Sequence, residues 1–326
     1  MDRDEILYLL SHAEHVTGLL RKSDAVRHTW CGDEVHIRGI IEFSNYCCRN
    51  CLYCGLRRDN RKITRYRMAE DDIIARAIEI AAHGIRTIVL QSGDDFYFTQ
   101  AMLCRIVTRI KERTGVAVTL SVGERPFEDY AAFRQAGADR YLLKYETANE
   151  TLYARLHPHH TLAGRLRILD YLRNLGFQTG TGNIVGLPGQ TLNDLCSDIL
   201  LLGELDTDMT SIGLFLPQQD TPLSGCPCGD VPLTLKVLAL ARMETRNSHM
   251  PVTTALVTAN PEGGLADGLR AGANVIMPDF TPEQFRKDYA IYDNKVQITP
   301  ANVKEAILTV HRKVAEGPGD TLKPCR

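Results

Sequence analysis

Residues 37–54 read IRGIIEFSNYCCRNCLYC, an apolar run rich in β-branched residues that leads into a cluster of four cysteines. Short apolar runs recur along the chain, and segments with helical periodicity lie between them, which indicates alternating strands and helices. The apolar runs are Ile37–Phe43, Thr87–Gln91, Val116–Ser121, Arg140–Lys144, Gln178–Ile184, Met209–Leu216, Val252–Leu256 and Asn274–Met277. The helical segments are Glu70–Ala82, Met102–Ile110, Phe127–Gln135, Leu162–Leu175, Leu192–Leu205 and Leu233–Arg246.

Eight strands that alternate with helices predict a parallel α/β fold, and eight such units can close into a TIM-type (β/α)8 barrel. An open doubly wound sheet is the alternative. A helix over Glu5–Lys22 is expected to cap the barrel, and a helical tail is expected after Val303. We therefore expect a single domain, divided into an N-terminal cap (1–35), a barrel (36–298) and a C-terminal tail (299–326).

The composition is that of an ordinary globular protein and argues against several classes of function. Of the 326 residues 44% are hydrophobic and 24% charged, and the net charge of −2 gives no reason to expect nucleic acid as a partner. No apolar run is long enough for a membrane span, and Met1–Glu5 lacks the apolar core of a signal peptide, so a cytoplasmic protein with no membrane association is expected. Disulfides are not expected in that compartment, so the clustered cysteines need a metal explanation.

Cys47, Cys51 and Cys54 have the spacing C-x3-C-x2-C. Three thiolates can bind three irons of a [4Fe–4S] cluster and leave the fourth iron open, and S-adenosylmethionine (SAM) can chelate such an iron through its amino and carboxylate groups. Cys48 could replace Cys47 and give C-x2-C-x2-C. A closed zinc site is the other alternative, but it needs four ligands, and the distant Cys226-Pro227-Cys228 is only a C-x-C pair.

The segment C-x3-C-x-Tyr-C directly after a first strand resembles the signature of the radical SAM superfamily, in its biotin synthase-like branch. This resemblance implies one [4Fe–4S] cluster held by three cysteines, SAM as a second cofactor, and cleavage of SAM to a 5′-deoxyadenosyl radical. In the same resemblance, Tyr53 stands where an aromatic residue lies near the SAM adenine.

Other positions receive SAM-binding roles from the same resemblance. Ser92-Gly93-Asp94 resembles a Gly-Gly-Glu segment that receives the SAM ammonium group, although a simple strand-end turn would also suit it. Glu146 is expected at the ribose hydroxyls, and Lys144 or Arg165 at the SAM carboxylate, whereas isolated charges are otherwise surface residues. Met209 resembles the apolar lining of the cavity and is counted with the cofactor-binding residues.

Longer segments resemble the [FeFe]-hydrogenase maturase family HydE. They are Gly32–His36, Ile41–Cys47, Asn50–Asn60, Val89–Gly93, Glu146–Asn149, Gly186–Thr191, Thr253–Ala255 and Gly272–Pro278. The resemblance implies action on an iron–carbonyl–cyanide–cysteine synthon during maturation of the hydrogenase H-cluster. It also implies a monomer that takes electrons from a donor such as ferredoxin or flavodoxin and works with other hydrogenase maturases. Thr253, Thr254 and Tyr292 resemble cavity residues that bind the anionic synthon, although plain barrel core is the default for such positions.

Four departures from this family leave an alternative open. Asp94 replaces the usual Glu, Lys144-Tyr145 replaces Arg-His, and only Cys325 follows Cys228, so the cysteines of a second cluster are missing. Phe215–Leu223 resembles methylornithine synthase. The alternative function is therefore a mutase that acts on lysine or a related amino acid. A non-catalytic iron–sulfur or metal carrier is a third class, which would explain the cysteines but not the SAM-binding positions.

Overall fold

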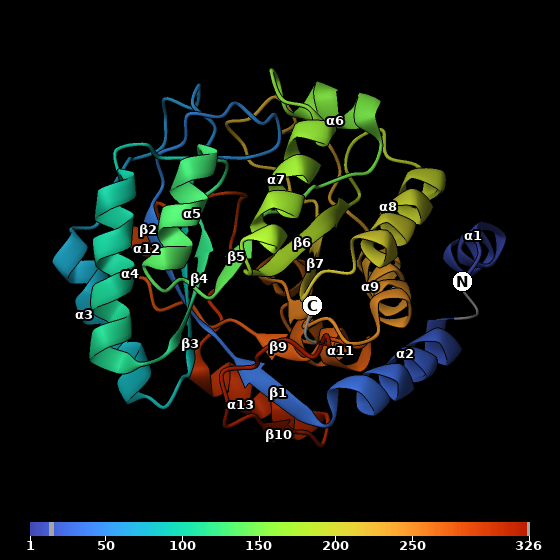
Figure 1. Ribbon diagram of the computed structural model, residues 1–326. Helices are drawn as coiled ribbons and strands as arrows, with labels where there is room; N and C mark the ends of the chain where they lie inside the picture. The colour runs from blue at the N-terminus through green and yellow to red at the C-terminus, as the bar shows by residue number, and fades with distance from the viewer. Residues whose placement is uncertain (13–15, 325–326) are drawn as a thin grey trace.

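The structure is a computed structural model that describes residues 1–12 and 16–324. Parallel strands alternate with α-helices along the chain, which confirms the predicted α/β class (Figure 1). Among the described residues, no helix is both long and apolar enough to cross a lipid bilayer.

The strands form two sheets. They are β1 (Glu34–Ile37), β2 (Gly39–Ser44), β3 (Thr87–Ser92), β4 (Ala117–Ser121), β5 (Arg140–Leu142), β6 (Gln178–Val185), β7 (Met209–Leu214), β8 (Pro251–Val252), β9 (Val275–Ile276) and β10 (Lys313–Val314). One sheet has the order β2-β3-β4-β5-β6-β7 and the other the order β10-β1-β9-β8. Because neighbouring strands pair in parallel, the C-terminal ends of β2 to β7 meet at one edge, where ligand sites of such folds form.

Single bridges join the two sheets at both of their borders. At one border, Met209 at the start of β7 pairs with His249, which precedes β8. At the other, Ile40 in β2 pairs with Asp279, which follows β9. β1 and β2 are one extended segment interrupted only at Arg38, so the predicted run Ile37–Phe43 spans both.

Helices surround the strands (Figure 1). They are α1 (Arg3–Ser11), α2 (Val16–Cys31), α3 (Glu70–Ala82), α4 (Gln100–Thr114), α5 (Phe127–Gln135), α6 (Glu150–Leu156), α7 (Leu162–Asn174), α8 (Leu192–Leu205), α9 (Val231–Thr245), α10 (Thr254–Ala259), α11 (Gly264–Arg270), α12 (Glu283–Arg286) and α13 (Pro300–Thr309). α3, α5 and α8 have the predicted bounds. In α3, for example, Ile73, Ile74 and Ala77 are buried on one face, and acidic residues fill the first turn, where they face the positive end of the helix dipole.

Two predicted elements are wrong in part. The run Val252–Leu256 is not one strand, because β8 ends at Val252 and the extended Thr253 is the N-cap of α10. The β-branched composition of this stretch indicated a strand, but burial of Leu256 is achieved in a short helix. The predicted helix Glu5–Lys22 is also divided, since α1 ends at Ser11, His12 is extended and α2 begins at Val16; residues 13–15 lie outside the described residues.

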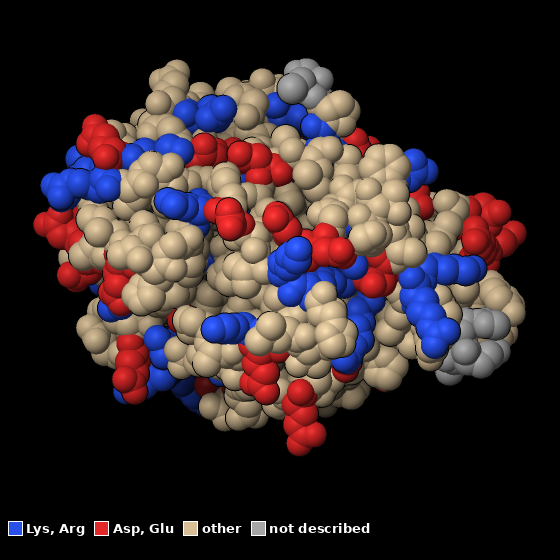
Figure 2. All heavy atoms as spheres, turned by 90° about the horizontal axis from the view of Figure 1, so that it is seen from below, with Lys and Arg blue, Asp and Glu red and all other residues tan. Residues whose placement is uncertain are grey.

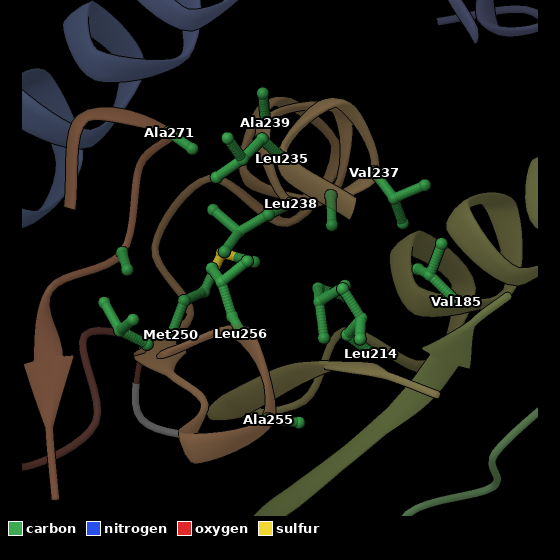
Figure 3. Packing of buried hydrophobic residues seen from close by; sticks show 14 of the residues in the cluster. Val185, Leu214, Leu235, Val237, Leu238, Ala239, Met250, Ala255, Leu256 and Ala271 are labelled. Atoms are coloured by element: carbon green, nitrogen blue, oxygen red, sulfur yellow. The ribbon is translucent and has the colours of Figure 1, made fainter. Parts of the chain in front are cut away.

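The larger part of the core is built around α9. This helix contacts β6 and β7, while α1 and α2 pack against it as well, so that Thr234–Arg242 are all buried. Figure 3 shows Leu235 and Leu238 of α9 among Leu214 of β7 and Leu256 of α10. Because the hydrophobic effect rewards removal of apolar surface from water, the two N-terminal helices complete this core.

The segment after β10 lies across the N-terminal ends of the strands. The carbonyl of Pro318 accepts hydrogen bonds from Thr87 at the start of β3 (2.7 Å) and from Arg140 at the start of β5 (3.1 Å). His249, just before β8, contacts the carbonyl of Asp320 at 2.8 Å. Seen from below, this side of the molecule carries positive and negative side chains interspersed (Figure 2).

The start of α8 gives a test of the fold. Thr191 and Asp194 form a capping box, in which each side chain accepts a hydrogen bond from the backbone N–H of the other (3.2 and 2.7 Å). Thr191→Ala should lower the free energy of unfolding in urea by about 1 kcal/mol. Thr151→Ala, at an exposed helical position, is the control and should change it by less than about 0.5 kcal/mol. Equal losses in both variants would contradict the capping role.

Candidate active site

The loop that follows β2 carries the four clustered cysteines and lies at the top of Figure 1. Burial raises the pKa of the Cys47, Cys51 and Cys54 thiols, to about 11 for Cys54, and charge repulsion from Cys54 raises the pKa of Cys47 and Cys51 further. Cys48 is exposed, and its charged neighbours include Asp94 and Arg49. The structure therefore groups Cys47 with Cys51 and Cys54 and leaves Cys48 at the surface.

The surroundings of these thiols fit an iron–sulfur cluster. The backbone N–H groups of Arg49 and Asp94 both donate to Cys47 Sγ at 3.4 Å, and such bonds stabilise a thiolate that binds iron. Neighbouring thiols whose pKa values are raised lose their protons together only when positive charge lies beside them. The iron ions of a cluster would supply that charge. A closed zinc site needs four ligands, whereas this loop buries three thiols and leaves Cys48 exposed.

The loop after β3 lies directly against the cysteine loop. The N–H of Gly93 donates to the carbonyl of Ser44 at 3.3 Å, and the N–H of Cys48 donates to the carbonyl of Asp94 at 3.0 Å. A Cβ atom at Gly93 would lie 2.3 Å from the carbonyl oxygen of Tyr46, so only glycine allows this approach. The predicted Ser92-Gly93-Asp94 segment is thus in contact with the cysteine loop.

Asp94 is part of a network of charges. Its Oδ2 accepts hydrogen bonds from Arg49 Nε (2.6 Å) and from the N–H of Glu124 (3.0 Å). A Cβ at Gly123 would lie only 1.7 Å from Asp94 Oδ1, and Gly123 has a φ of 74°, so glycine is required there. Asp94 therefore connects the loops that follow β2, β3 and β4.

Glu124 extends this network toward α7. Its Oε1 is 2.6 Å from Arg165 Nε, and its Oε2 is 3.2 Å from an Arg49 nitrogen and 3.4 Å from His160 Nδ1. Burial acts to raise the pKa of Glu124, but Arg165 and Arg49 outweigh it and hold that pKa below its usual value. Sequence reasoning did not find Arg49, Glu124 and His160, because Arg49 occupies a variable position of the C-x3-C spacing and the other two belong to no motif.

The two cations considered for the SAM carboxylate lie close to each other. Arg165 donates to the backbone carbonyl of Lys144 at 2.8 Å, and Lys144 Nζ is 3.1 Å from Glu146 Oε2. Arg165 is thus an inward-facing ion-paired residue rather than a surface one, with a side chain 13% exposed.

Glu146 has an unusual backbone and an unsatisfied side chain. Its φ is 72°, in the left-handed region that non-glycine residues rarely occupy. Its Oε2 is buried and makes no hydrogen bond of good geometry to any described residue, Lys144 included, although the two charges are near. Strain combined with an unsatisfied buried acceptor is typical of a ligand-binding residue.

Tyr53 is held by a histidine that sequence reasoning did not find. Its hydroxyl is 2.9 Å from His157 Nε2, and His157 Nδ1 is 3.0 Å from the carbonyl of Tyr153, on whose ring His157 stacks. Burial lowers the pKa of His157 to about 4. The neutral ring therefore donates from Nδ1 to the carbonyl and accepts the proton of Tyr53 at Nε2.

Comparisons with known proteins place this site in a family. Residues 41–202 match the Radical SAM superfamily. The chain is 51% identical over 278 residues to the [FeFe] hydrogenase maturase subunit HydE of Thermotoga maritima, which covers 85% of this chain and 79% of that protein.

The chain belongs to the HydE family of radical SAM enzymes. Radical SAM enzymes use a [4Fe–4S] cluster and SAM, and the thiols described above fit that cluster. The chain is also 25% identical to 3-methylornithine synthase of Methanosarcina acetivorans, over 93% of this chain and 87% of that protein. A crystal structure of methylornithine synthase superposes with a TM-score of 0.87 at 23% identity, covering 96% of this chain and 94% of that one, which shows a shared fold.

In this HydE-family chain, the structure does not bring Met209 to the site. Met209 begins β7 and its sulfur lies 2.8 Å from an Arg38 nitrogen. The C-terminal end of β7, at Leu214, is roughly 16 Å farther along the strand. The register thus places Met209 at the opposite end of β7 from the loop that carries the thiols, and its assignment to the cofactor-binding residues stays a prediction.

The other predicted cavity residues differ in what they can offer a ligand. Tyr292 is buried, and its hydroxyl has no well-aligned hydrogen-bond partner within the described part of the chain, although the Thr258 hydroxyl is near. The Thr253 hydroxyl already donates to the carbonyl of Ile212 at 3.2 Å, and Thr254 begins α10.

The remaining cysteines do not form a second centre among the described residues. Cys226 packs against the small apolar cluster that contains Leu187 and Phe215, whereas Cys228 is exposed. Cys325 lies outside the described residues.

The buried His157 predicts a pH dependence of stability. Between pH 6.5 and about 4 the unfolded chain binds a proton that the folded protein excludes, so stability should fall as pH falls through this window, by up to about 3 kcal/mol. His157→Gln, which retains an acceptor for Tyr53, should flatten the profile of unfolding free energy against pH. His83→Gln, at an exposed position, is the control and should parallel the wild type. A His157→Gln profile that also parallels the wild type would contradict the buried neutral ring.

Proposed function

We propose that this chain acts in maturation of the [FeFe]-hydrogenase H-cluster, on an iron–carbonyl–cyanide–cysteine synthon. The observation that carries the proposal is the 51% identity to HydE of Thermotoga maritima over 85% of the chain. The proposal includes a cytoplasmic monomer, an electron donor such as ferredoxin or flavodoxin, and other hydrogenase maturases as partners.

The proposed fold is a closed (β/α)8 barrel in a single domain, with a cap at 1–35, the barrel at 36–298 and a tail at 299–326. Hydrogen bonds across both sheet borders support closure. The N–H of Thr210 donates to His249 at 2.9 Å, and the N–H of Ile40 donates to Pro278 at 3.0 Å. A closed barrel would enclose its reactants away from water, which radical chemistry requires.

In the proposed site, Cys47, Cys51 and Cys54 hold the cluster, which when bound supplies the electron that breaks a C–S bond of SAM. Asp94 would receive the SAM ammonium group through the carboxylate oxygen that Arg49 does not hold. Glu146 would accept hydrogen bonds from the ribose through its unsatisfied oxygen.

Three further residues complete the proposed SAM site. Lys144 and Arg165 are the two cations offered to the SAM carboxylate. A hydrogen bond from the Arg165 guanidinium to the Lys144 backbone carbonyl joins the two residues. Tyr53, oriented by the neutral His157, would present its ring to the adenine.

Tyr292 is the strongest candidate for a contact to the substrate. Its buried hydroxyl is left to donate a hydrogen bond, and an anionic iron complex would accept one. Because the Thr253 hydroxyl donates its proton to the Ile212 carbonyl, it can only accept a hydrogen bond from a substrate. Thr254 would add a second hydroxyl beside it.

A specific observation supports the alternative, a methylornithine synthase-like mutase. The loop that resembles that enzyme is anchored beside Tyr292: the N–H of Asp293 donates to the Pro217 carbonyl at 3.2 Å. Gln218 is buried in this loop, and its side chain accepts from the N–H of Asp220 at 2.8 Å. The loop therefore lies against the segment that carries Tyr292, where in this alternative it would influence which substrate is accepted.

Electron paramagnetic resonance on anaerobically reconstituted protein distinguishes these functions. One sample contains SAM, reductant and the iron–cysteine synthon, and a parallel sample contains L-lysine instead. A new low-spin iron signal that depends on the synthon is the expected result. Absence of that signal, together with 5′-deoxyadenosine and a lysine isomer in the parallel sample, would move the chain to the mutases.

Cys51→Ala tests the cluster ligands. The variant should lose SAM cleavage, measured as 5′-deoxyadenosine release with dithionite, because two thiolates cannot hold the cluster with one open iron. Cys48→Ala is the matched control in the same loop and should retain cleavage within about twofold. Cleavage by the Cys51 variant would refute the ligand assignment, and loss in the Cys48 variant alone would shift it to C-x2-C-x2-C.

Tyr292→Phe tests the substrate contact. It should leave the binding of SAM unchanged and slow turnover of the synthon by about tenfold, the loss of one hydrogen bond to a charged group. Tyr97→Phe, at an exposed position, is the control. Turnover of the Tyr292 variant at the wild-type rate would remove Tyr292 from the site.

A further inference from the structure

The segment that leaves the cysteine loop is strongly basic in a chain that is not. Residues 57–67 read RRDNRKITRYR and carry six Lys or Arg side chains against one Asp, whereas the whole chain has a net charge of −2. Such a concentration of one sign produces a local positive potential that the overall charge conceals.

Two of these six cations have structural tasks. Arg65 donates to the backbone carbonyls of Leu56 (3.0 Å), Arg57 (2.8 Å) and Asn60 (3.2 Å), and so fixes the course of the loop. Arg67 pairs with Asp95 at 2.7 Å. The other four cations lie within residues 57–62, which we call the basic loop.

The basic loop presents its charge to solvent. The side chains of Arg58 and Lys62 are 58% and 80% exposed, and Arg61 is exposed as well. Arg58 is 3.1 Å from Asp59, and Lys62 is 2.9 Å from Asp220. Exposed pairs of this kind contribute little to stability, so the cations are not explained by the fold.

Backbone hydrogen bonds tie the basic loop to the cysteine loop. The N–H of Arg57 donates to the carbonyl of Cys54 at 3.0 Å, and the N–H of Arg58 donates to the carbonyl of Arg49 at 2.7 Å. The exposed cations therefore lie on the outer side of the loop that carries the three clustered thiols. The opposite side of the molecule carries positive and negative side chains interspersed (Figure 2).

We propose that the basic loop is the docking surface for an acidic one-electron carrier protein that reduces the cluster. The proposal rests on the proposed function, because a cluster that cleaves SAM has to be supplied with an electron at each turnover. In the docking complex one electron passes from the carrier, which is oxidised by one electron, to the cluster, which is reduced by one; no bond or proton moves in this step. Positive charge beside the cysteine loop steers an acidic carrier to the surface nearest the cluster. A nucleic acid would satisfy the charge but could not supply the electron.

Reduced flavodoxin, an acidic carrier, is the probe, and the rate of 5′-deoxyadenosine release is the readout. The variant Arg58→Glu/Lys62→Glu/Arg61→Glu reverses three charges of the basic loop. The control Arg113→Glu/Lys304→Glu/Lys313→Glu makes the same change in net charge at exposed positions elsewhere. We expect the first variant to lose about tenfold or more of the flavodoxin-driven rate, while its dithionite-driven rate stays at the wild-type level. The control should keep both rates.

Three outcomes would overturn the docking surface. The first is a wild-type rate with flavodoxin in the basic-loop variant. The second is an equal loss of rate in the control variant. The third is a flavodoxin-driven rate that changes neither when salt is added nor when the charges are reversed. Salt provides the second measurement on unaltered protein: the flavodoxin-driven rate should fall by about tenfold as ionic strength rises, and the dithionite-driven rate should not. An RNA oligonucleotide that binds the basic loop without being displaced by flavodoxin would assign the surface to nucleic acid instead. Because dithionite bypasses docking, failure of wild-type cleavage with dithionite would count against the proposed function and not against this surface.

Discussion

The close approach of Gly93 to the backbone of Tyr46 and Cys47 is the constraint on which the site depends. A side chain at this position would push apart the loops that follow β2 and β3. With the two loops in contact, the N–H of Asp94 reaches Cys47 Sγ and the carboxylate of Asp94 reaches Arg49. Gly123 has the same role in the loop after β4, because the absence of a side chain there leaves room for the Asp94 carboxylate. Two glycines thus align three successive strand ends into one surface.

The charges on this surface alternate, which explains how so many can be buried together. Arg49 lies between Asp94 and Glu124, and Glu124 lies between Arg49 and Arg165. In a partly dry site Arg49 and Glu124 are each compensated on two sides, and removal of Arg49 would leave the Asp94 carboxylate without its ion pair. The network also fixes Arg165 and Lys144 before a ligand arrives, so less conformational entropy is lost when one binds.

Much of the fold could be predicted because its signals are local. The apolar residues of α3, α5 and α8 recur from one helical turn to the next, so the sequence alone indicates each helix. The bounds of these three helices are the predicted ones. The cysteines were found for the same reason. Arg49, Glu124 and His160 could not be found in this way, because their connection arises only when loops after β2, β4 and α6 meet. For Met209, the resemblance conveyed a chemical type but not a depth along β7. The predicted strand Val252–Leu256 was wrong because short-range composition does not distinguish a strand from one and a half helical turns.

The segment after β10 that bonds to Thr87, Arg140 and His249 has a consequence for the order in which the fold is completed. These three residues lie at or just before the starts of β3, β5 and β8, yet their partners are the carbonyls of Pro318 and Asp320, close to the end of the chain. Arg140 Nη2 donates to the carbonyls of Pro318 and Gly319, so this part of the buried guanidinium is satisfied only after residues 318–320 have folded across the starts of the strands. Gln178 and Thr87 hold the other nitrogens, so displacement of the segment would leave one buried nitrogen of the cation without a partner rather than the whole group.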